Sequence, residues 1–158
     1  MNTLENAIGK LCKAILPINE EIFFGNQKST IAICTLSSIS LLKEISESDM
    51  MEKIALAGRL LSENKGIDSL VRYVITSNTV KTIIVCGKDV TGHKAGHSLL
   101  ALYKNGIDDD SRIIDSHSPD PVLTVTKNEV TRFCNKVKLL DMIGETSLEK
   151  INQAVELN

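Results

Sequence analysis

The sequence predicts an α/β protein with a Rossmann-like, doubly wound and mostly parallel sheet that carries helices on both faces. Short runs rich in β-branched residues alternate with helical patterns from residue 30 to the end. Only 3% of the residues are aromatic, so Ile, Leu, Val and Ala must build the core, as in strands buried on both faces. The length of 158 residues fits a single domain, in which residues 1–20 form an N-terminal helix and its lead-in.

The first elements are a helix and two short strands. Residues 3–15 have apolar side chains at helical spacing, and this pattern ends before the first proline. These side chains are Leu4, Ile8, Leu11 and Ile15. The run 30–36 (TIAICTL) is typical of a buried strand, and 54–58 (IALAG) is compatible with a short second one. The segments 37–47 and 49–57 are expected to be helical or mixed.

The middle of the chain has the clearest alternation. Residues 64–77 place apolar side chains on one helical face, and the run 82–86 (TIIVC) predicts the next strand. A helix is expected from about residue 94 to residue 105, ended by Gly106. Residues 112–114 predict a short strand before a proline-containing loop.

Two capping-box patterns mark helix starts in the last part of the chain. TKNE at 126–129 opens a helix through residue 135, and TSLE at 146–149 opens a final helix to residue 157. The run 137–142 (VKLLDM) between them predicts the last strand.

Charge and cysteine content exclude several classes of protein. The net charge is −2 and the basic residues are scattered, so we expect no nucleic acid partner. The four cysteines are far apart, without CxxC spacing or a preceding signal peptide, which predicts reduced thiols in a cytoplasmic protein. No apolar run approaches the ~20 residues of a membrane span, so no direct span is expected.

The loop CGKDVTGHKAG, residues 86–96, lies where a doubly wound sheet binds its ligands, beyond the carboxyl end of a strand. Gly87, Gly92 and Gly96 permit close approach of the backbone to a ligand. Their spacing does not match the GxGxxG pattern of dinucleotide binding, and no P-loop is present.

Among the residues of this loop, His93 is the candidate metal ligand. A neutral imidazole is a good ligand for a metal ion, and its second nitrogen needs a partner, for which Asp89 is the nearest carboxylate. One alternative is a histidine that only forms hydrogen bonds within the loop. Another is a zinc site shared with His97, one helical turn away, with His117, Cys86 or a distant carboxylate as third ligand.

The stretch CGKDVTGHKAGHSLLALYKNGID resembles the corrinoid-carrying A subunit of tetrahydromethanopterin S-methyltransferase, a protein of methanogenic archaea. Other segments agree in the same order, and together they cover roughly residues 23–145. These segments are FFGNQKSTIAICTL, SENKGIDSLVRYVITSNTVKTIIVCG, RIIDSHSPDPVLTV and VKLLDMIGE.

The resemblance implies a cobalamin (cobamide) cofactor whose cobalt is coordinated by the histidine of the Gly-His pair, here His93. It implies a methyl carrier that accepts a methyl group on cobalt, as from methyl-tetrahydromethanopterin, and passes it to a thiol such as coenzyme M. The implied partners are methyl-donor and methyl-acceptor methyltransferase subunits. The loops expected to border the corrin ring contribute Thr35, Leu36, Ser37, Glu63, Asn64, Gly66, Gly87, Asp89, Gly92, Gly96, Asp115, Ser116 and Pro119.

The chain also departs from the family it resembles. Members of that family usually end in a membrane-spanning helix, whereas this sequence stops at Asn158 after the final helix and no apolar tail begins. The sequence is therefore either a shortened chain or a soluble relative, and we expect the soluble relative. The loop DSHSPDP at 115–121 is bulkier and more acidic than its counterpart, and TLSSIS at 35–40 lacks a glycine. These departures keep open a soluble cobamide-binding or regulatory module without methyl transfer.

Overall fold

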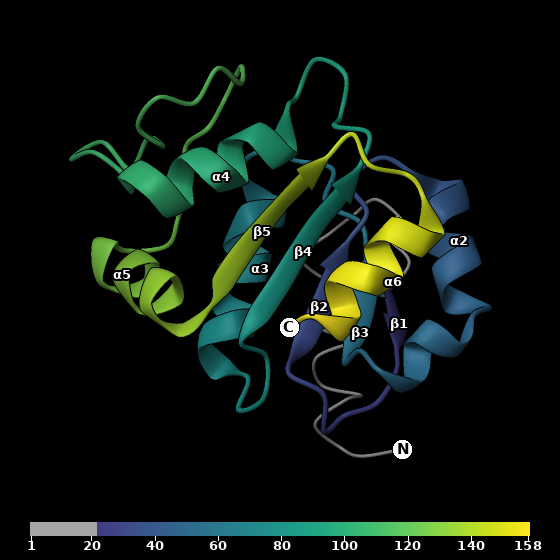
Figure 1. The fold of residues 1–158 in the computed structure, drawn as a ribbon. Coiled ribbons are helices and arrows are strands. Elements are labelled where there is room, and N and C mark those ends of the chain that lie inside the picture. The colour runs from purple at the N-terminus through teal and green to yellow at the C-terminus, as the bar shows by residue number, and fades with distance from the viewer. Residues whose placement is uncertain (1–21) are drawn as a thin grey trace.

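The computed structural model describes residues 22–158 and has a five-stranded sheet with helices on both faces (Figure 1). The strands are β1 (Ile22–Phe24), β2 (Ile31–Cys34), β3 (Leu56–Gly58), β4 (Thr82–Gly87) and β5 (Lys138–Ile143). The helices are α2 (Ile39–Ser46), the 3-10 helix η1 (Asp49–Glu52), α3 (Lys65–Thr76), α4 (Ala95–Asn105), α5 (Lys127–Lys136) and α6 (Leu148–Glu156). The helix expected at 3–15 lies outside the described residues.

The strand order is β1-β3-β2-β4-β5. Neighbouring strands from β3 to β5 are parallel, and only the edge strand β1 is antiparallel to its neighbour β3. This arrangement confirms the predicted α/β class with a mostly parallel sheet.

Each face of the sheet has its own core. Helices α3, α4 and α5 pack on one face, over a cluster that includes Val85, Leu99 and Phe133. Helices α2 and α6 cover the other face, where Ile84 and Ile151 are buried. Side chains of β4 alternate between the two clusters because successive residues of a strand point to opposite faces. The central strands are therefore buried on both sides, as their continuous apolar runs predicted.

The chain leaves β2 and β4 in opposite directions at the carboxyl edge of the sheet. After β2 it enters α2 on one face, and after β4 it enters α4 on the other face (Figure 1). The two loops are joined: Ser37 N donates to Lys88 O, and Lys88 N donates to Ser38 Oγ. Such a divergence point is the usual ligand-binding position of a doubly wound sheet.

Two expected elements differ from the structure, and one strand was not expected. The segment expected to be helical or mixed at 49–57 contains only η1 before β3 begins. The strand expected at 112–114 is not part of the sheet, because its residues form isolated bridges to Ile107 and Val122 within their own loop. Strand β1 was not predicted, since three residues are too few for a pattern.

The first predicted capping box is confirmed, and the second is wrong. Thr126 Oγ1 accepts from Glu129 N, while Glu129 Oε2 accepts from Thr126 N. At α6 the N-cap is Ser147 rather than Thr146, and Ser147 Oγ accepts from Lys150 N. The adjacent hydroxyl takes the capping position, so the reciprocal pair expected from TSLE does not form.

A buried carboxylate attaches the long segment between α4 and α5 to α3. Asp68 is 4% exposed and accepts hydrogen bonds from the backbone N–H groups of Thr124 and Val125 and from Thr124 Oγ1. This attachment matters for function because the same segment contains residues 115–121, which lie over the candidate site.

Two of the thiols are free, as the sequence predicted. Burial raises the pKa of Cys86 far above its ordinary value, and the nearby Cys34 and Glu145 add to that rise. Burial also raises the pKa of Cys134. Both groups therefore stay protonated at neutral pH. No helix within residues 22–158 is long and apolar enough to cross a membrane.

Candidate functional site

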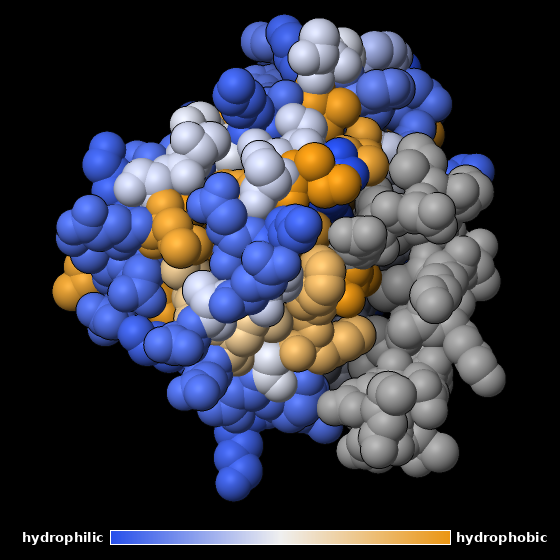
Figure 2. Space-filling view, turned by 90° about the vertical axis from the view of Figure 1, so that its right-hand side faces the viewer, coloured by the Kyte–Doolittle hydropathy of each residue, from blue (hydrophilic) through white to orange (hydrophobic). Residues whose placement is uncertain are grey.

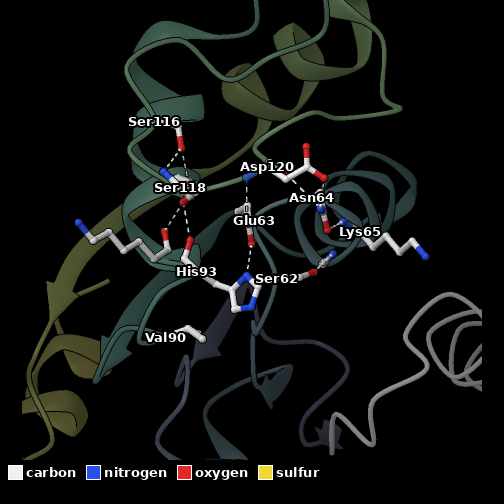
Figure 3. A network of polar contacts seen from close by, with 12 residues as sticks. Ser62, Glu63, Asn64, Lys65, Val90, His93, Ser116, Ser118 and Asp120 are labelled. Atoms are coloured by element: carbon white, nitrogen blue, oxygen red, sulfur yellow. Dashed lines mark hydrogen bonds and ion pairs between the residues drawn. The ribbon is translucent and has the colours of Figure 1, made fainter.

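Three loops meet beside the carboxyl edge of the sheet and bring together side chains that are far apart in sequence (Figure 3). Glu63 comes from the loop before α3, His93 from the loop between β4 and α4, and Ser118 and Asp120 from the segment after α4. These contacts span 24 to 57 residues of sequence.

His93 presents one nitrogen to the protein and the other outward. Its side chain is 57% exposed, and Nδ1 lies 2.9 Å from Glu63 Oε2. Figure 3 shows the second ring nitrogen pointing away from Glu63. A carboxylate oxygen accepts hydrogen bonds, so this contact places the proton of a neutral ring on Nδ1 and leaves a lone pair on Nε2.

Glu63 is buried and bridges two loops. Its side chain is only 2% exposed, and its second oxygen, Oε1, accepts a hydrogen bond of 3.1 Å from Asp120 N. The neighbouring Asn64 caps α3 by accepting from Lys65 N, and its Nδ2 donates to Asp120 O. With both oxygens engaged, the carboxylate has a fixed orientation, and so does the imidazole that it holds.

Asp89 does not contact His93, so the sequence-based expectation for this pair was wrong. Asp89 Oδ1 accepts from Val90 N and Gly96 N, and Oδ2 accepts from His97 N. The first turn of α4 has backbone N–H groups without partners in the helix, and the carboxylate satisfies two of them. Asp89 therefore holds the start of α4, while Glu63 holds the imidazole.

The backbone of His93 is held by a group of serines. Ser118 Oγ donates to His93 O, and its oxygen also lies within hydrogen-bond distance of Ser98 Oγ. Ser98 Oγ is in turn 2.6 Å from Ser116 Oγ (Figure 3 shows Ser116 and Ser118). Ser98 and Ser118 are buried, so these hydroxyls fix the distance between the His93 loop and the segment over it.

Lys94 adopts a left-handed conformation directly before α4, with φ 47° and ψ 48°. A non-glycine residue in this conformation destabilises the folded state by roughly 1–2 kcal/mol. Glycine removes this strain, but it also loses more conformational entropy on folding, which offsets part of the gain. We therefore expect Lys94→Gly to raise the free energy of unfolding by about 0.5–1 kcal/mol, measured by urea denaturation. The matched control Lys104→Gly, at an exposed helical position, should lower it by about 1 kcal/mol. A loss at both positions would contradict this account.

The glycines of the site have different surroundings. A Cβ on Gly87 would lie 2.4 Å from Thr35 O, and one on Gly96 would lie 2.8 Å from Leu36 Cδ1. A Cβ on Gly66 would be 2.8 Å from Leu60 Cδ1. Gly92, by contrast, has no atom within 4 Å of its Cβ position. Of these four glycines, only Gly92, next to His93, has no neighbour at its Cβ position.

The other residues predicted to border a cofactor lie at the same edge of the sheet, and they differ in how exposed they are. Thr35 and Leu36 are fully buried, and Arg59 donates to Leu36 O and to Ser37 O. Asp115 and Pro119 are exposed on the segment over the site, and Ser116 is half-buried there. Contact of these residues with a cofactor stays a prediction.

The histidines do not converge on one point with Cys86. The rings of His97 and His117 lie against each other, with centroids 4.7 Å apart. Cys86 packs in the core under α2 and α6, on the other face of the sheet. Between residues 22 and 158 there is no group of three or more His, Cys, Asp or Glu side chains placed to hold a metal ion.

Sequence reasoning missed Ser98, Ser118 and Arg59. Nothing in the pattern distinguishes a loop serine that is buried from one that is exposed. Arg59 did leave a signal, because it directly follows strand β3, where a charged side chain reaches the binding edge.

Residues 13–157 match the family described as the A subunit of tetrahydromethanopterin S-methyltransferase. The chain belongs to this family. The A subunit from Methanocaldococcus jannaschii is 33% identical over 141 residues, which cover 88% of this chain and 57% of that relative. A Methanosarcina barkeri protein, provisionally named as the A subunit of methyltransferase Mtx, is 35% identical over 147 residues, covering 92% of this chain and 71% of that protein.

Membership in this family confirms the resemblance found in the sequence. The family and its named relatives are methyltransferase subunits, which implies further subunits beside them. The chain spans a little over half the length of the Methanocaldococcus jannaschii relative.

Proposed function

We propose that this protein is a corrinoid-binding methyl carrier in which His93 Nε2 would bind the cobalt. It would accept a methyl group, as from methyl-tetrahydromethanopterin, and pass it to a thiol such as coenzyme M. One observation carries the proposal: an exposed imidazole whose inward nitrogen is held by a buried carboxylate. Family membership supports the class of reaction.

The residues present fit a corrinoid. An imidazole nitrogen with a free lone pair is a suitable ligand for cobalt, and Glu63 orients this ring. No atom lies within 4 Å of the Gly92 Cβ position, so the backbone directly before His93 is uncovered on that side. When bound, cobalt would supply the atom that takes up and releases the methyl group.

The surrounding residues would set the position of the imidazole. Asp89 holds the start of α4, and Ser118 holds the His93 carbonyl, so the loop is anchored on both sides of the ligand. Asp120 N keeps Glu63 in place. The predicted contacts at residues 35–37, 63–66 and 115–119 would border the ring.

The carrier needs two partners with active sites of their own. The donor and acceptor would be bound by other methyltransferase subunits, consistent with the subunit names of the relatives. The exposed position of His93 at one edge of the domain supports such a role, because each partner could reach the same cofactor in turn.

The test uses cobinamide, a corrinoid that lacks its own nucleotide base, so that only the protein can supply an axial nitrogen. The Co(II) form is bound to wild type, His93→Ala and His97→Ala, and electron paramagnetic resonance is recorded. We expect nitrogen splitting of the cobalt signal in wild type and His97→Ala, and its loss in His93→Ala. Splitting retained in His93→Ala, or no cobinamide bound to wild type, would refute the assignment.

A second measurement separates a carrier from a module that only binds the cofactor. The loaded, reduced protein is mixed with methyl-tetrahydromethanopterin and the donor-side partner, and methylation is followed by visible absorbance. A methylation that requires both components supports the carrier. Binding without methylation would favour a cobamide-binding or regulatory module.

A further inference from the structure

A mostly polar cavity lies at the carboxyl edge of the sheet, where the loops after β2, β4 and β5 meet. Its volume is about 410 Å³. Figure 2 views the molecule from the side on which α2 lies and shows polar side chains over much of that face, with apolar ones exposed among them. The residues that line the cavity include Ser38, Ile39, Ser40, Glu44, Lys88 and Thr146.

The cavity and His93 share one loop. Lys88 lines the cavity, and the same loop continues to His93 before it enters α4. Lys88 N donates to Ser38 Oγ, and Ser37 Oγ donates to Lys88 O over 2.7 Å, so this loop is joined to the start of α2. The cavity and the imidazole are therefore connected by a short stretch of backbone that hydrogen bonds hold in place.

The lining combines groups that suit an anion with an exposed apolar side chain. Ser38 Oγ is engaged by Lys88 N and does not cap α2, so the first backbone N–H groups of this helix keep their positive end toward the cavity. The first turn of α2 contains no acidic residue, and Lys88 adds a positive charge. Ile39 is 53% exposed and offers an apolar surface beside these groups. A ligand with an anionic part and a flat apolar part would match both features.

We propose that this cavity binds the nucleotide tail of a complete cobamide, an inference that rests on the proposed function. The tail consists of a phosphodiester, a ribose and an aromatic base. The phosphodiester would bind at the start of α2 beside Lys88, and the base would pack on Ile39. Glu44 would accept hydrogen bonds from the ribose hydroxyls.

The state of the cofactor selects this occupant. The base of a free cobamide can occupy the axial position that His93 would take, so the tail needs another place once the imidazole binds. A volume of about 410 Å³ lies within the range of roughly 300–1,000 Å³ that is usual for small-molecule sites. A tail tethered to a ring at His93 is also present at an effective concentration in the millimolar range, so a few contacts are enough to hold it.

Two corrinoids that differ only in the tail test the proposal. Cobalamin carries the nucleotide, and cobinamide has the same ring and cobalt without it. The dissociation constants of both, in the same oxidation state, are measured by visible spectroscopy for wild type, Lys88→Gln and Ile39→Ser. The matched control Lys43→Gln changes another exposed lysine of α2, which lies outside the cavity lining.

We expect Lys88→Gln to raise the dissociation constant of cobalamin about 3- to 10-fold and to leave that of cobinamide unchanged. Ile39→Ser should show the same selectivity, and Lys43→Gln should change neither constant. The free energy needed to detach the base from cobalt is the same for every variant, so it cancels in this comparison.

The outcomes separate this inference from the proposed function. If cobinamide binds with nitrogen splitting that depends on His93, while Lys88→Gln has no effect on cobalamin or weakens both corrinoids equally, the tail site alone is refuted. If wild type binds neither corrinoid, the proposed function fails and this inference fails with it.

Amide chemical shifts give a readout that does not depend on affinity. In ¹H–¹⁵N spectra with the diamagnetic Co(III) forms, the backbone N–H signals of Ser40 and Leu41 should shift with cobalamin and not with cobinamide. Identical shifts with the two corrinoids would overturn the proposal. Shifts of these signals with AMP but not with cobalamin would assign the cavity to a free nucleotide and would refute it as well.

Discussion

Glu63→Gln is expected to weaken cobinamide binding about 10- to 100-fold, because partners that orient a metal-bound histidine usually contribute that much. The carboxylate offers one acceptor to His93 Nδ1 and one to Asp120 N. Glutamine has only one acceptor oxygen, so one of these two donors loses its partner. The dissociation constant is measured by titrating cobinamide and following its visible spectrum.

Two comparisons separate orientation of the imidazole from general damage. The control Glu149→Gln changes an exposed glutamate of α6, far from the site in the fold, and should leave the dissociation constant unchanged. Nitrogen splitting of the Co(II) signal should persist in Glu63→Gln at saturating cobinamide, since His93 is still present. A variant with lowered Tm but unaltered affinity would show that Glu63 acts only on the fold.

We expect Gly87→Ala to lower the free energy of unfolding by about 3 kcal/mol. Alanine would be strained in the left-handed conformation of this residue, and its Cβ would overlap with neighbouring atoms. Gly87 has φ +76°, and a Cβ there would lie 2.4 Å from Thr35 O and 2.9 Å from Ser38 Oγ. The carbonyl belongs to the backbone of the neighbouring loop and cannot rotate away as a side chain would. The Tm should fall by roughly 6–12 °C, measured by calorimetry.

Gly92→Ala is the matched control for this prediction. Gly92 has a similar φ of +82°, but no atom lies within 4 Å of its Cβ position. The loss should therefore be limited to backbone strain, about 1 kcal/mol. Similar losses for the two variants would show that the overlap with Thr35 is relieved by movement of the loops. The tight junction between the β2 and β4 loops would then have to be reconsidered.

The central strands could be predicted because their signal is local. The runs at 30–36 and 82–86 are mostly apolar and contain no charged residue, and this pattern arises wherever a strand is buried on both faces. The capping box at Thr126 was predicted for the same reason, since its two partners are three residues apart. Short or edge elements such as β1 carry no comparable signal, because their pairing is decided by the neighbouring strand.

The sequence by itself determined the α/β class, the family, and the position of His93 at the end of a buried strand. Each of these depends on residue types and spacings within short stretches. Only the tertiary structure decided that Glu63, rather than Asp89, holds the imidazole, and that Ser118 holds its backbone. The physical reason is that Asp89, although close in sequence, is taken by the free N–H groups of α4. The partner of His93 comes from 30 residues away, through strand pairing and loop packing that no local pattern records.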